Sequence, residues 1–285
     1  MSDDGQEALT LIAFVGSVFS PYYAWSGRRD PLDHAAVNVA LYRRGGGGRW
    51  SLTERGRGAL RRGSDSLQIG PSALWLDGEA LQVEVDERGW PIPRRMRGQV
   101  RLRPEVGGGP SHLLCAHGEH RWWPIAPRAR VEVTFREPAV RWSGTGYLDC
   151  NWGAEPLEQA FHTWTWSRAP LSRGAVVLYD VWPRHSPRQA MALRFDGSGA
   201  AQPLEQPPPV RLPSTLFAIG RHTRSEAQAG LLRTLTSSHF YARSVVRTTL
   251  CGESVVGIHE SLSLDRFSTR WAKLLIPFRM PRSAR

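Results

Sequence analysis

The segment RWSGTGYLDCNWG, residues 141–153, holds the densest group of residues capable of chemistry. Tyr147 and Asp149 are two positions apart, so on an extended backbone both side chains project to the same side. His120 and Trp122 lie upstream with the same two-residue spacing. An aspartate among tryptophans loses solvation of its charged form, which raises its pKa and can keep it protonated near neutral pH. The residues alone favour a turn aspartate with packing aromatics and leave a proton-donating acid as the alternative.

A metal site is the second chemical possibility, in the segment SHLLCAHGEH, residues 111–120. Four potential ligands fall within nine positions: His112, Cys115, His117 and His120. His117 and His120 differ by three positions and would face opposite sides of a regular strand. No second cysteine or carboxylate completes a standard ligand set. We therefore expect no metal, and a structural or hydrogen-bonding role for His112 and His117.

The elements that must position these residues are strands. Short runs with period-two alternation cover residues 37–42, 81–86, 131–136 and 191–195. Such runs indicate antiparallel strands with one solvated face. No strand–helix alternation is visible, so we predict an all-β architecture of barrels or sandwiches with few short helices. One short helix is expected over residues 268–275.

The proline-rich stretch QPLEQPPPVRLP, residues 202–213, is the strongest candidate for a domain boundary. Three consecutive prolines remove backbone donors and stop a central strand. We therefore predict an N-terminal β domain over residues 1–200, which carries the GYLDCNWG motif, and a smaller C-terminal β domain over residues 201–285.

Composition narrows the class of protein. The 285-residue chain has a formal net charge of +11 and 12 tryptophans. Its arginines are scattered and form no nucleic-acid-binding module, so nucleic acid is not expected as a partner. A basic, tryptophan-rich chain suits a large apolar ligand or a bilayer interface. The acidic start, the three separated cysteines and the lack of an apolar run of about 18 residues predict a cytoplasmic protein without a membrane span.

Several longer strings resemble the carotenoid 1,2-hydratases, also called hydroxyneurosporene synthases. The resemblance runs over nearly the whole chain and is carried by GSVFSPYYAWSGRRDP (16–31), RWSLTERG (49–56), FHTWTWSRA (161–169), HESLSLDRF (259–267) and LLIPFRMPR (274–282). It implies a pair of lipocalin-like antiparallel β-barrel domains and a hydro-lyase that needs no cofactor. The implied reaction adds water to the terminal C1–C2 double bond of an acyclic carotene, such as neurosporene or lycopene, and yields a 1-hydroxy carotenoid.

The resemblance also implies four site residues: His120 and Trp122 in HRW, and Tyr147 and Asp149 in GYLD. Protonation of a weakly basic alkene demands a neutral carboxylic acid in a dry pocket, so Asp149 is the expected proton donor. The faces of Trp122 and Tyr147 would stabilise the resulting tertiary cation. His120 would either deprotonate the attacking water or position Asp149 through a hydrogen bond. Further tryptophans are expected to contact the substrate: Trp142, Trp152, Trp164 and Trp166.

The expected partners are an acyclic carotene and water. Because such a carotene resides in the bilayer, we expect this basic chain to associate peripherally with the inner photosynthetic membrane. Two other functions fit the same scaffold. One is a lipocalin-like carotenoid carrier, which would not need Asp149; the other is a pericyclase or isomerase. The preferred carotene, the number of ends hydrated and the oligomeric state stay open.

Overall fold

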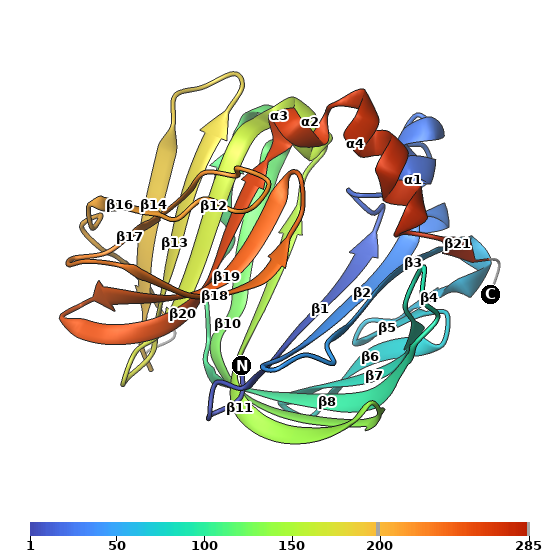
Figure 1. Ribbon diagram of the computed structural model, residues 1–285, viewed down its shortest axis with the longest axis horizontal. Helices are drawn as coiled ribbons and strands as arrows, with labels where there is room; N and C mark the ends of the chain where they lie inside the picture. The colour runs from blue at the N-terminus through green and yellow to red at the C-terminus, as the bar shows by residue number, and fades with distance from the viewer. Residues whose placement is uncertain (198–199, 284–285) are drawn as a thin grey trace. The chain divides into compact units, whose positions relative to one another are not determined.

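The computed structural model describes residues 1–197 and 200–283, and its strands are mainly antiparallel (Figure 1). The chain forms two compact units. Unit 1 comprises residues 1–103, 130–146 and 273–285, and unit 2 comprises residues 104–129 and 147–272.

Two sheets supply the strands of unit 1. A four-stranded sheet has the order β1 (Glu7–Val15), β2 (Ala35–Arg43), β3 (Arg49–Arg55) and β21 (Arg282–Ser283). An eight-stranded sheet has the order β11 (Ala139–Trp152), β10 (His120–Glu137), β8 (Arg95–Val106), β7 (Ala80–Arg88), β6 (Ser72–Asp77), β5 (Ser66–Ile69) and β4 (Leu60–Arg62), with β9 (His112–Cys115) also paired to β10. Three of these strands, β8, β10 and β11, continue from one unit into the other.

The core of unit 1 is built from the alternating residues that the sequence pattern singled out. One buried cluster contains the inward members of three of the predicted runs: Val37, Val39, Val83, Val85, Val131, Val133 and Phe135. Successive side chains of a strand point to opposite faces, and residues 83–86 and 131–136 alternate between buried and more exposed positions accordingly. The prediction of half-buried strands is confirmed for these two runs, whereas β2 also buries Ala36 and Ala40 on its other face.

Unit 2 contains a seven-stranded antiparallel sheet and a two-stranded one. The larger sheet has the order β15 (Ala201–Pro203), β14 (Gln189–Phe195), β13 (Ala175–Pro183), β12 (Phe161–Pro170), β20 (Glu253–Ser263), β19 (Tyr241–Leu250) and β18 (Gly230–Ser237). The smaller sheet pairs β16 (Pro209–Leu212) with β17 (Arg221–Arg224).

The helices are short, as predicted. The α-helices are α1 (Pro21–Trp25), α2 (Leu157–Ala160), α3 (Leu264–Phe267) and α4 (Arg270–Leu275), and the 3₁₀ helices are η1 (Pro31–Asp33), η2 (Arg57–Ala59), η3 (His117–Glu119) and η4 (Ile276–Phe278). The helix expected over residues 268–275 is α4. Within the described residues, no helix has the length and apolarity that crossing a membrane requires.

Two expectations about the architecture differ from the structure. The mostly β fold is confirmed, but across residues 1–197 and 200–283 each large sheet ends in unpaired edge strands, so neither closes into a barrel. The expected boundary at residue 200 falls inside unit 2, where β14 pairs with β15 across it. Each compact unit is instead assembled from separate stretches of the chain, because the chain passes repeatedly from one unit to the other. A local proline signal does not reveal such an arrangement.

Candidate active site

A hydrogen-bonded cluster joins β10 and β11 within unit 2. The indole Nε1 of Trp122 donates to the Tyr147 hydroxyl oxygen (2.9 Å) and to Asp149 Oδ2 (3.0 Å). The Tyr147 hydroxyl donates to the same Oδ2 (2.9 Å). Three of the four residues implied by the resemblance therefore meet at one carboxyl oxygen.

Asn151 adds a further donor to this oxygen. Its Nδ2 donates to Asp149 Oδ2 at 3.3 Å, and its Oδ1 accepts from the Tyr179 hydroxyl at 3.3 Å. Among the described residues, every hydrogen bond to the Asp149 carboxyl reaches Oδ2, and Oδ1 accepts none. The carboxyl is thus held on one side and open on the other.

Burial raises the pKa of the Asp149 carboxyl. Although a part of its surface stays accessible, the surrounding protein desolvates the carboxyl and raises its pKa from 3.8 to about 6. The negative charge of Glu260 acts in the same direction, whereas the hydrogen bonds from Tyr147, Trp122 and Asn151 favour the carboxylate and lower the pKa. Desolvation exceeds the effect of the hydrogen bonds, so a large fraction of Asp149 is protonated in mildly acidic solution.

His120 lies two residues before Trp122 on β10 and is buried. Its ring packs against Phe161, with centroids 5.1 Å apart. Gly153 presses against the imidazole so closely that a Cβ there would lie 2.2 Å from His120 Nδ1. Burial lowers the pKa of His120 and favours the neutral ring. Within the described part of the chain, its buried Nε2 has no hydrogen-bond partner, and no hydrogen bond links His120 to Asp149.

The seven-stranded sheet contributes further side chains to this cluster. Trp166 of β12 lies opposite Tyr179 of β13 and opposite Glu260 of β20, so these side chains share one face of the sheet. The Trp166 ring contacts the Tyr147 ring at 5.0 Å. Glu260 is held by Arg243, whose Nε lies 2.9 Å from Glu260 Oε1. This face therefore brings aromatic rings and one paired carboxylate to the acid.

Comparison with known proteins identifies the family. A model of the family described as carotenoid hydratase CrtC matches residues 11–285. The chain belongs to the carotenoid hydratase family.

Individual relatives agree over nearly the whole chain. The acyclic carotenoid 1,2-hydratase of Thiocapsa roseopersicina is 52% identical over 288 residues, which cover 99% of this chain and 71% of that protein. The acyclic carotenoid 1,2-hydratase of Rhodobacter capsulatus is 40% identical over 279 residues, which cover 96% and 98%. A solved structure from Nitrosomonas europaea, assigned as AttH, shares the fold with a TM-score of 0.61 at 16% identity, over 92% of this chain and 88% of that one.

In this hydratase Trp122 was expected to present the face of its ring to the substrate cation, but the structure shows a different contact. Its side chain is fully buried. Its ring lies against His112 (5.4 Å between centroids), Tyr179 (5.0 Å) and Phe195 (6.4 Å). Because neighbouring rings cover it, the contact that Trp122 makes with the site is its N–H bond to Asp149.

Of the four tryptophans expected to contact substrate, Trp164 and Trp166 lie in this group. Trp164 is partly exposed, and its ring lies 6.2 Å from Tyr179 and 6.0 Å from Phe161. Trp166 is buried against Tyr147, and among the described residues its Nε1 has no acceptor.

Trp142 and Trp152 do not join the cluster. Trp142 packs against the core of unit 1, and Trp152 is 45% exposed. Trp142 precedes Tyr147 by five positions and Trp152 follows Asp149 by three. Such odd spacings place side chains on opposite faces of a regular strand.

The histidines of residues 112–120 contact aromatic rings and one carboxylate. His112 stacks on Trp122, while His117 lies beside Glu155 (3.6 Å) and the ring of His185 (4.7 Å). Across residues 1–197 and 200–283, no group of three or more His, Cys, Asp or Glu side chains is arranged to hold a metal ion.

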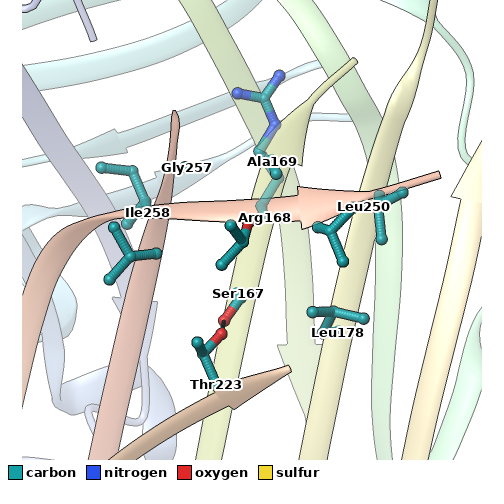
Figure 2. A pocket seen from close by; sticks show the side chains of 11 residues that line it. Ser167, Arg168, Ala169, Leu178, Thr223, Leu250, Gly257 and Ile258 are labelled. Carbon is teal, nitrogen blue, oxygen red and sulfur yellow. Dashed lines mark hydrogen bonds between the residues drawn. The ribbon is translucent and has the colours of Figure 1, made fainter. Parts of the chain in front are cut away.

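A pocket on the other face of β12 is a packing feature. It is lined mainly by apolar residues of the unit 2 core, and its polar lining residues are Ser167, Arg168, Thr223 and Thr248. The hydroxyl groups of Ser167 and Thr223 face each other (Figure 2) and are joined by a hydrogen bond of 3.2 Å. Ser167 also bonds to Nδ1 of the fully buried His259 (2.7 Å). Ser167 follows Trp166 directly, so the pocket lies across the sheet from the acid.

Sequence reasoning missed four residues of the site. Asn151 and Gly153 continue the two-residue spacing of Tyr147 and Asp149, so the same periodicity could have found them. Two others, Tyr179 and Glu260, belong to strands that are distant in the chain: β13 and β20. No local signal marks these two.

Proposed function

We propose that the protein adds water to the terminal C1–C2 double bond of an acyclic carotenoid, with Asp149 as the proton donor. Membership of the family and its full-length relatives make the protein an acyclic carotenoid 1,2-hydratase, a hydro-lyase. The observation that carries the role of Asp149 is its carboxyl, which has a pKa of about 6 and hydrogen bonds on Oδ2 only.

The first step transfers the proton of the neutral acid from Oδ1 to C2 of the alkene. The π electrons form the new C–H bond, C1 becomes a tertiary cation, and Asp149 becomes a carboxylate. The donors on Oδ2 come from Trp122, Tyr147 and Asn151, and they stabilise this negative charge as it develops. Tyr147 and Trp164, which keep part of their surface exposed, supply rings that attract the cation.

The second step is attack of water on C1, followed by loss of one proton. His120 suits the role of the base, because it is held neutral and its Nε2 has no other partner among the described residues. The tyrosines do not suit it, since burial raises the pKa of both Tyr147 and Tyr179 well above 10. Return of the proton to Asp149 completes the cycle, and alkene plus water gives the tertiary alcohol without redox change.

The direct experiment is incubation of the purified protein with neurosporene or lycopene in detergent micelles. We expect a product heavier by one water, and in D₂O one non-exchangeable deuterium at C2. Asp149→Asn should lower turnover by ~10²–10⁴-fold, the usual contribution of general acid catalysis. Asp77→Asn, an exposed aspartate of β6, is the matched control and should keep full turnover.

Three outcomes would contradict the proposal. Turnover by Asp149→Asn above about a tenth of wild type would remove Asp149 as the acid. Carotenoid binding without a mass change would indicate a carrier. An isomerised product of unchanged mass would indicate the pericyclase or isomerase class.

We further propose that the protein takes its substrate at a membrane surface. An acyclic carotenoid is apolar and partitions into the bilayer, and the chain is strongly basic. Cosedimentation with anionic vesicles that weakens as salt rises would support this association, because salt screens the attraction between surface charges. Absence of vesicle binding at every salt concentration would contradict it.

A further inference from the structure

The segment formed by α4 and η4 exposes its large apolar residues instead of burying them. Trp271, Leu274, Leu275 and Phe278 are 56%, 65%, 46% and 69% exposed. The spacing of Trp271, Leu274 and Leu275, three and four positions, is that of one face of α4, and Phe278 is exposed in η4, which follows directly. An ordinary surface helix turns such a stripe inward, but the buried residue of α4 is the small Ala272. We call these four exposed residues the apolar stripe.

A second apolar projection is fixed beside the beginning of α4, within unit 2. Leu216 and Phe217 are 102% and 50% exposed. Arg266 of α3 holds this loop through a hydrogen bond from Nη1 to the Phe217 carbonyl (2.6 Å), and it also reaches the His239 carbonyl (3.4 Å). The His239 ring in turn contacts Trp271 at 5.9 Å. The loop and the start of the stripe are therefore held together as one exposed apolar feature.

The residues around the stripe in the sequence are basic. From Arg266 to the end of the sequence there are six basic residues and no acidic one. Arg270 is exposed, and Arg279 lies over the Trp50 ring at 4.3 Å. In the described part of the chain, neither Arg270 nor Arg279 contacts a carboxylate, and Arg266 bonds to carbonyl groups. The charges of Arg270 and Arg279 are thus not paired within the described residues, whereas Arg282 is paired with Asp33 and Glu54.

The exposed apolar side chains and the neighbouring arginines together favour one kind of binding partner. Exposed Trp, Leu and Phe side chains beside arginine are the composition of helices that lie in the headgroup region of a membrane. A second copy of the chain would bring a like-charged surface and a net charge of +11 against the first, which disfavours self-association. A bilayer with anionic headgroups satisfies both the apolar stripe and the basic residues.

We propose that α4 and η4 are the docking surface of the protein on an anionic lipid bilayer, with the apolar stripe inserted below the headgroups. This inference rests on the proposed function for its purpose, since docking brings the site to a bilayer-dissolved carotenoid. The surface itself stands on exposure, spacing and charge.

The test is flotation of the full chain with phosphatidylcholine vesicles, with and without phosphatidylglycerol. The double variant Leu274→Gln, Phe278→Gln should bind anionic vesicles at least tenfold more weakly than wild type. Its matched control is Leu76→Gln, Ile92→Gln, which alters two similarly exposed residues (54% and 63%) outside the segment. The control should bind within about twofold of wild type. Arg270→Gln should weaken binding to anionic vesicles by about fivefold, the usual effect of one basic residue near an anionic surface.

Folding is checked by far-UV circular dichroism and the thermal midpoint, which the exposed substitutions should leave unchanged. Equal vesicle binding by the double variant and its control would overturn the proposal, as would absence of wild-type binding. A change of oligomeric state in the double variant with unchanged vesicle binding would also overturn it, because a second copy would then cover the stripe.

Hydration in detergent micelles separates this inference from the proposed function. The double variant should keep its turnover within about twofold in micelles, and it should lose turnover on carotenoid embedded in vesicles. If the wild type adds no water in micelles, the proposed function fails, and the vesicle-binding result still decides the docking surface.

Discussion

Asp149 carries a stability cost that its replacement should remove in a pH-dependent way. In the folded protein the pKa of this carboxyl is about 6, and its ordinary value is 3.8. Between these two values the folded state binds more protons than the unfolded state. The free energy of unfolding therefore falls as pH rises from about 4 to about 6, and the loss persists above that range.

The size of this cost follows from the two pKa values. Each pKa unit corresponds to 1.36 kcal/mol, so a difference of about 2 amounts to ~3 kcal/mol. Asp149→Asn has no charge to bury, and its amide oxygen can accept the same donors that reach Oδ2. The stability of the variant relative to wild type should therefore increase by ~3 kcal/mol between pH 4 and pH 8. The inactive variant should be the more stable protein at pH 8.

Urea unfolding of both proteins at a series of pH values measures this difference. Comparison of variant with wild type at each pH cancels the other titrating groups, which the two proteins share. Asp77→Asn repeats the measurement at an exposed position and should show no such trend. A relative stability of Asp149→Asn that stays constant from pH 4 to pH 8 would refute the assignment of a raised pKa to this carboxyl.

Three further substitutions test the cluster through the pH dependence of turnover, which should fall as pH rises through about 6 in the wild type. Tyr147→Phe removes a donor to the Asp149 carboxylate, so this limb should move to higher pH by about one unit; an unchanged limb would show that this bond does not set the pKa. Asn151→Ala should move it less, because its bond is longer, at 3.3 Å; a larger movement than in Tyr147→Phe would contradict the geometry. Gly153→Ala should displace His120 and lower turnover by ~10²-fold without moving this pH-dependent fall of activity. Near-normal turnover would mean that the close contact between Gly153 and His120 is not needed for the reaction.

The strands and the unit 1 core were predictable because they depend on local alternation. Val37, Val83 and Val131 occupy the inward positions that a two-residue period requires. Closure of the sheets was not predictable in this way, since it depends on whether edge strands such as β4 and β15 find partners far along the chain. The two compact units also escaped local reasoning, because β8, β10 and β11 pass between them.

The same distinction between local and long-range features applies to the candidate site. The spacing of Tyr147 and Asp149 predicts a shared face, and the resemblance adds Trp122, whose N–H bond to Asp149 then requires the pairing of β10 with β11. Tyr179 and Glu260 join the group only because β13 and β20 flank β12. Residue types and periods are local properties, whereas strand order is a property of the whole chain.

The arrangement around Asp149 reconciles two opposed demands of alkene hydration. The acid must be neutral before it meets a very weak base, and its carboxylate must be stable once the proton has left. Desolvation and the charge of Glu260 serve the first demand by raising the pKa. The donors gathered on Oδ2 serve the second, and in the proposed reaction they leave Oδ1 to deliver the proton. A carboxyl with donors on both oxygens would ionise more readily and lack a free edge, so the one-sided bonding is what fits Asp149 for this step.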